Sequence, residues 1–95
     1  MLILLLLACN DPCEQACAAT ARELAGCIEG WNADWEDLDA TSRADFRSQC
    51  EEDWQALRAE LEAREVKRAK EQCDAAVDEA GELSCDAWRA LYLEP

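Results

Sequence analysis

Histidine is absent from this chain of 95 residues, glycine occurs three times, and 22 acidic side chains outnumber nine basic ones. Without histidine, the side chain most often used for proton transfer near neutral pH is missing, and three scattered glycines form no phosphate-binding loop. A net charge of −13 leaves no basic surface to displace the counterions of a phosphate backbone. We therefore expect neither an enzyme nor a nucleic-acid-binding protein, and we predict no catalytic residue, cofactor or metal site.

Bulky apolar side chains are also scarce. Hydrophobic residue types make up 51% of the chain, but seven of these residues are cysteines and many others are alanines. A single small domain with so little to bury commonly needs disulfides, a metal or a partner to stay folded. Seven cysteines favour disulfides, and therefore an oxidising compartment such as the bacterial periplasm.

Three of the cysteines lie on one predicted helix, residues 12–30, which an Asn-Asp-Pro turn introduces. At about 100° per residue, Cys13, Cys17 and Cys27 share one face of this helix. Because thiols fixed along one rigid helix are badly placed to bond one another, we expect each to bond a cysteine elsewhere. The partners left for them are Cys50, Cys73 and Cys85. The fifteen possible connectivities of six cysteines then fall to six, among which the sequence does not choose.

The stretch 42–80 gives two conflicting signals. It has no glycine, proline or asparagine and consists mainly of strong helix formers, which predicts one long helix. Its apolar stripe, however, shifts by about 120° between the part that ends at Leu61 and the part that begins at Val66. On a straight helix Cys50 and Cys73 would also lie about 34 Å apart, whereas the outermost thiols of the first helix are only about 21 Å apart. Both observations favour a break between Leu61 and Val66.

These patterns predict an all-α fold, a small disulfide-stapled helical bundle. Its expected helices are residues 12–30, 42–61, 65–80 and 85–92, and the alternative has 42–80 as one long helix. The last helix places Cys85, Trp88 and Tyr92 on one face, so we expect it to pack back on the bundle through that face.

The chain begins MLILLLLAC, with an apolar run too short to span a bilayer, which takes about 20 residues. The motif Leu6-Leu7-Ala8-Cys9 resembles a lipobox, the signal at which bacterial lipoproteins are cleaved and lipid-modified. The resemblance implies that residues 1–8 are a signal remnant, and that Cys9 carries a diacylglycerol thioether and an N-acyl chain such as palmitate. It also implies that residues 9–95 form one six-cysteine domain anchored to a membrane through Cys9.

Seven cysteines cannot all pair with one another in disulfides. If Cys9 is lipidated, the remaining six can form three disulfides. The alternative is that the apolar run belongs to the core and that Cys9 is a structural or free thiol.

The four tryptophans fall into two groups. Trp54 and Trp88 lie in apolar helical stripes and are expected in the core. Trp31 and Trp35 lie beside acids in the connection 31–40, where they either pack on the core or contact a partner. A rim of acids around tryptophan suits a basic or amphipathic protein partner better than a membrane.

We therefore interpret the chain as a lipid-anchored protein of the bacterial cell envelope, on the periplasmic face or the outer membrane. It would be a non-enzymatic structural or protein-interaction module with an unknown envelope protein as its partner. One of the six connectivities, the nested set Cys13–Cys85, Cys17–Cys73 and Cys27–Cys50, resembles that of saposin-like domains, which implies a lipid-binding module as an alternative. A secreted toxin or defence protein is a further alternative, although the acidic charge argues against a membrane-lytic cation.

Overall fold

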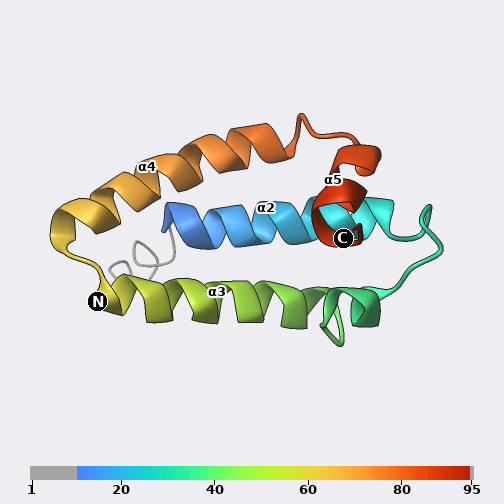
Figure 1. Ribbon diagram of the computed structural model, residues 1–95, viewed down its shortest axis with the longest axis horizontal. Coiled ribbons are helices and arrows are strands. Elements are labelled where there is room, and N and C mark those ends of the chain that lie inside the picture. Colours follow the sequence, from blue (N-terminus) through green and yellow to red (C-terminus); the bar gives the residue numbers. More distant parts are fainter. Residues whose placement is uncertain (1–10, 95) are drawn as a thin grey trace, which may run out of the picture.

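The computed structural model describes residues 11–94 as a bundle of α-helices with one short 3₁₀-helix and no strand in that range (Figure 1). The elements are α2 (Pro12–Cys27), η1 (Trp35–Leu38), α3 (Arg43–Glu60), α4 (Ala63–Ala80) and α5 (Cys85–Tyr92). The central helix is α2, which lies between α3 and α4, while α5 packs across its C-terminal part. The prediction of an all-α disulfide-stapled bundle is confirmed.

The helix α2 begins as its sequence indicates and ends earlier than expected. The Asp11 carboxylate accepts a hydrogen bond from the backbone N–H of Cys13 at 2.8 Å, and proline occupies the first helical position. The helix ends at Cys27 rather than at residue 30. The chain continues through tighter turns, in which the N–H groups of Trp31 and Asn32 donate to the carbonyls three residues before them, until Asn32 adopts a left-handed backbone with φ of 59°. This residue turns the chain toward η1.

The predicted break in the stretch 42–80 is confirmed, and the single long helix is wrong. Helix α3 ends at Glu60, and Leu61 is extended, with φ of −92° and ψ of 149°. Helix α4 then begins at Ala63, two residues before the predicted start. A capping box supports the new helix, in which the backbone N–H of Glu62 donates to the Glu65 carboxylate at 3.0 Å.

Each disulfide joins α2 to a different helix, as expected for thiols along one rigid helix. The bonds are Cys13–Cys73 to α4, Cys17–Cys50 to α3 and Cys27–Cys85 to α5. The nested connectivity is therefore wrong. After the break, α4 runs in the same direction as α2, so its C-terminus and α5 reach the end of α2 opposite to Cys13 (Figure 1).

The apolar core lies at that second end of the bundle. Leu24 has no exposed surface, and it clusters with Ala19, Cys27, Ala80 and Trp88. Side chains that are partly buried against this cluster are Trp31, Trp35, Leu38 and Phe46. The first half of α2 has no comparable cluster within residues 11–94 and is held by two disulfides instead. In the described part of the chain, no helix combines the length and apolarity needed to cross a bilayer.

We expect peptide mapping of the unreduced, denatured protein to yield three linked pairs, one for each of these disulfides. Trypsin alone leaves Cys73 and Cys85 in one peptide, so a glutamyl endopeptidase is added, which cuts after Glu14 and after Glu79. The same digest after reduction is the control. A peptide that links Cys13 to Cys85 would contradict the parallel arrangement of α2 and α4.

Candidate interaction surfaces

The end of the bundle where α2 begins also contains the turn between α3 and α4 (Figure 1). Cys9, the predicted lipidation site, lies outside the described residues, and Asp11 follows it by two positions. Asp11 is only 7% exposed, which is unusual for an aspartate. The contacts of Asp11 therefore show what fixes the chain two residues after Cys9, the predicted lipidation site.

Asp11 is held by two side chains of α3. The indole N–H of Trp54 donates to its Oδ2 at 3.1 Å, and the Arg58 guanidinium donates to the same oxygen at 2.8 Å. The other oxygen, Oδ1, accepts from the backbone N–H of Cys13. Trp54 is itself buried, so its ring and the ion pair together fix the start of α2 against α3. We call these three side chains, Asp11, Trp54 and Arg58, the Asp11 clamp.

The clamp favours the ionised form of Asp11. Burial alone would raise its pKa, but the hydrogen bonds from Trp54 and from the backbone amides of Cys13 and Glu14 outweigh burial, together with the positive charge of Lys70. The pKa of Asp11 therefore lies below its ordinary value. A carboxylate that stays charged keeps its ion pair with Arg58 throughout the neutral range.

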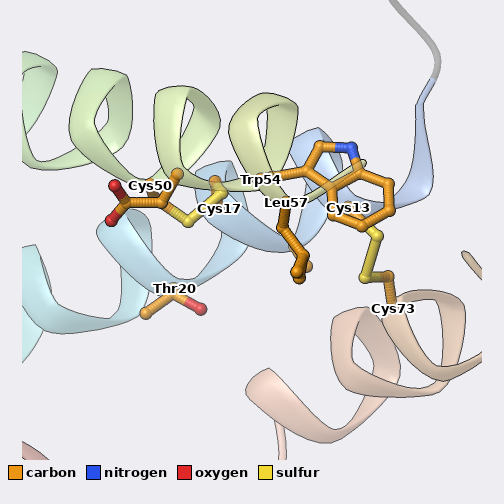
Figure 2. A pocket seen from close by; sticks show the side chains of 9 residues that line it. Cys13, Cys17, Thr20, Cys50, Trp54, Leu57 and Cys73 are labelled. Atoms are coloured by element: carbon orange, nitrogen blue, oxygen red, sulfur yellow. A yellow bond between two sulfur atoms is a disulfide. The ribbon is translucent and has the colours of Figure 1, made fainter. Parts of the chain in front are cut away.

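A groove of about 300 Å³ opens between α2, α3 and α4. It exists because α3 and α4 each pack along α2 and make little contact with each other. Figure 2 shows two disulfides, Cys13–Cys73 and Cys17–Cys50, in its wall. The other lining residues are Ala16, Thr20, Asp53, Trp54 and Leu57. The wall is largely apolar, and Leu57 is 49% exposed there.

The opposite end of the bundle has a row of contacting aromatic rings. Ring centroids lie 5.6 Å apart for Trp35 and Phe46, 5.9 Å for Phe46 and Tyr92, and 6.1 Å for Tyr92 and Trp88. Trp31 packs against the same core cluster. The structure thus brings Trp31 and Trp35 to one end of the molecule, each half-buried, with part of its surface open to solvent.

Acids surround these two tryptophans. Exposed acidic side chains of the connection are Glu29, Asp34, Glu36, Asp37 and Asp39. Apolar surface is also open at this end, since Leu91 is 67% exposed and Tyr92 is 43% exposed. The buried indole nitrogens of Trp31 and Trp88 have no hydrogen-bond partner within the described residues. We call this region, formed by the connection 28–40 and α5, the aromatic end.

The sequence identified part of these surfaces. Trp54 and Trp88 are buried, as predicted. Asp11 was expected only to cap α2, and its contacts with α3 were missed, because 47 positions separate it from Arg58. Arg58 and Glu62 have the i,i+4 spacing of an ion pair on a helix, but the break after Glu60 ends the helix between them. No local signal in the sequence connects Asp11 to α3.

Within residues 11–94, no three or more carboxylates and thiols are placed so that they could hold a metal ion. No protein-family model matches the chain, and no curated protein or solved structure is significantly similar to it.

We expect Asp11→Asn to lower the free energy of unfolding at neutral pH by about 1–3 kcal/mol, because the amide leaves Arg58 and the Trp54 indole poorly paired. The pKa of Asp11 is lowered in the folded protein, so the carboxylate stabilises the fold above its ordinary value of 3.8 and loses this effect as the pH falls through the lower folded value. The stability difference between the two proteins should therefore shrink in acid, as urea unfolding at pH 7 and pH 3 would measure.

Asp74→Asn is the matched control, because Asp74 is an exposed acid on α4. It should leave the stability nearly unchanged at both pH values. A difference between wild type and Asp11→Asn that stays constant from pH 7 to pH 3 would show that the charge of Asp11 does not contribute.

Proposed function

We propose that this chain is a lipid-anchored protein of the bacterial cell envelope, and that its stapled bundle is a non-enzymatic structural or protein-interaction module. One observation carries the proposal. All six cysteines of residues 11–94 are used in three disulfides with one another, so Cys9 has no partner among them. The remaining cysteine is the one in the lipobox-like motif Leu6-Leu7-Ala8-Cys9.

Two further features support an anchor at Cys9. Asp11, which caps α2, lies only two residues after it, so a lipid there would hold the domain close to the membrane surface. Disulfides persist in oxidising compartments, and a lipoprotein exported from the bacterial cytoplasm reaches one. The dependence of this small core on disulfides is therefore consistent with the proposed location.

The aromatic end supports the interaction part of the proposal. It lies at the end of α2 opposite to the predicted anchor, and would therefore be accessible to a partner when the chain is attached through Cys9 (Figure 1). Partly exposed Trp31 and Trp35, surrounded by acids, suit a basic or amphipathic envelope protein. The partner would bind through apolar contact with the rings and through charge attraction at the rim.

When the full chain is expressed in bacteria with their lipidation enzymes, we expect intact mass to show loss of residues 1–8 and gain of lipid on Cys9. The Cys9→Ser variant is the control, and it should keep its leader and form the same three disulfides. Recovery of the wild-type chain with Met1 retained and Cys9 unmodified would rule out the anchor.

A lipid-binding module of saposin type is the second candidate, and the groove between α2, α3 and α4 is the observation that favours it. Its apolar wall and its volume of about 300 Å³ would suit an acyl chain. Its volume lies at the lower limit of ordinary ligand pockets, which begin at about 300 Å³.

Co-sedimentation of residues 10–95 with neutral phosphatidylcholine vesicles distinguishes the two candidates. We expect no binding, because the anchored-module proposal assigns all membrane attachment to Cys9. Binding that is lost in Leu57→Asp, a change at the exposed wall of the groove, would favour the saposin-type alternative. Ala75→Asp, an exposed position on α4 that does not line the groove, is the matched control.

A further inference from the structure

The charges of α4 are arranged in an order that does not favour the helix. Its first eight residues contain four bases, Arg64, Lys67, Arg68 and Lys70, and its last ten contain four acids and no base. The N-terminal end of a helix has a partial positive charge and the C-terminal end a partial negative charge. This effect acts within the first and last turns, so Arg64 at the start and Asp78 and Glu79 at the end are slightly unfavourable, whereas Glu65 in the first turn is favourable. The helix dipole therefore does not explain why four bases gather in the first half of α4.

We call these four bases the basic start of α4. They lie at the end of the bundle where α2 begins, shortly after Cys9, the predicted lipidation site. The Sγ atom of Cys13 is 3.7 Å from the carbonyl oxygen of Ala69, which places the first turn of α2 beside this segment. Lys70 is close enough to Asp11 for its charge to lower the pKa of that carboxylate. Figure 1 shows the first turns of α4 at the same end as the start of α2.

Three of these bases are available for a ligand. Arg64, Lys67 and Arg68 are exposed and form no ion pair within the described residues. Lys70 is half-buried and lies near the Asp11 clamp. On a helix with about 100° per residue, the three exposed bases fall on one face.

The charge of the whole chain is distributed unevenly along the bundle. Residues 58–70 contain five bases and three acids, whereas the rest of the chain contains four bases and 19 acids. Two of the three acids in this segment, Glu62 and Glu65, form the capping box at the start of α4. Glu14 lies near the same end, in the first turn of α2. The anchor end is thus close to neutral as a whole, whereas most acids lie elsewhere along the chain. In the first half of α4 the three exposed bases share their face with one exposed acid, Glu71, which leaves that face with a net positive charge.

We propose that the basic start of α4 contacts the phosphate groups of anionic phospholipids in the membrane that holds the chain. This proposal rests on the proposed lipidation of Cys9. Without an anchor, a net charge of −13 would keep the chain away from an anionic surface. In an anchored bundle with the starts of α2 and α4 toward the membrane, these bases are nearer to the surface than the acids of the aromatic end. Charges beyond the Debye length of about 8 Å are largely screened. The molecule is 43 Å long, so the acids of the aromatic end are screened from the membrane.

Such a contact would orient the bundle. The basic start of α4 would lie against the headgroups, and the aromatic end would point away from the membrane. The acidic surface would then face solvent, where its repulsion from the anionic membrane is weakest. The proposed interaction module would then have a defined direction toward its partner.

The two lysines of the chain, Lys67 and Lys70, allow a direct test by amine acetylation, read by mass spectrometry. The anchored protein is placed on phosphatidylcholine vesicles with or without phosphatidylglycerol. On the anionic vesicles we expect acetylation of Lys67 to fall by about fivefold. This is the factor that corresponds to about 1 kcal/mol, the attraction of one Lys or Arg to an anionic membrane surface. The effect should disappear at 1 M salt, where the Debye length is about 3 Å.

The double variant Arg64→Glu/Arg68→Glu should abolish the protection of Lys67 and keep its fold, because acids near a helix N-terminus are favourable. The matched control is Arg43→Glu/Arg47→Glu, which makes the same charge change in α3 at the other end of the bundle and should leave the protection intact. Equal acetylation on both kinds of vesicle would overturn the proposal. Equal effects of the two double variants would also overturn it, because net charge alone would then account for the result.

If bacteria do not lipidate Cys9, the proposed function fails, and this surface is then tested separately. The full chain is coupled through the Cys9 thiol to a maleimide phospholipid in the same vesicles, because the six disulfide-bonded cysteines do not react. Protection of Lys67 on anionic vesicles would then support the headgroup contact even though the cellular anchor was wrong. Absence of protection in this arrangement would reject the contact as well.

Discussion

Three disulfides that start from one helix constrain every other element of this bundle. Because α2 is rigid, its three thiols have fixed positions, and α3, α4 and α5 must each bring a cysteine to one of them. In the chain-entropy model a disulfide that closes a loop of 33 to 60 residues contributes about 4 kcal/mol. The break after Glu60 removes at most about four backbone hydrogen bonds of about 1 kcal/mol each, some of which the capping box replaces. The disulfides outweigh the helix propensity.

The bundle is stabilised differently at its two ends. The apolar cluster around Leu24 and Trp88 lies at the aromatic end, where α5 covers α2. At the other end two disulfides and the Asp11 clamp hold the helices, and a groove remains between α3 and α4. The chain has few bulky apolar residues, and they pack the interior of the aromatic end only. At the other end the helices are held together by disulfides. This division explains why a groove persists next to two disulfides.

The sequence predicted the fold class and the break because both depend on rules that act along the chain. Helical periodicity placed three thiols on one face, and the shift in the apolar stripe located the turn near Leu61. The connectivity could not be predicted, because it depends on whether α4 runs parallel to α2, which only the packed structure decides. The Asp11 clamp was missed for a similar reason. Its carboxylate, indole and guanidinium meet through packing across 47 positions, and an aspartate before a helix is already explained as a cap.

The Asp11 clamp affects how strongly a lipid on Cys9 would restrict the orientation of the bundle. A lipid attached through a flexible linker would leave the domain free to rotate, since a flexible chain transmits no orientation. Here the chain is fixed at Asp11, two residues after Cys9, by a partly buried ion pair to Arg58 of α3. Only Asn10 separates Cys9 from Asp11 in the sequence, so modest charge differences near the membrane would be enough to set the direction of a bundle anchored through Cys9. The basic start of α4 and the acidic aromatic end provide such a difference.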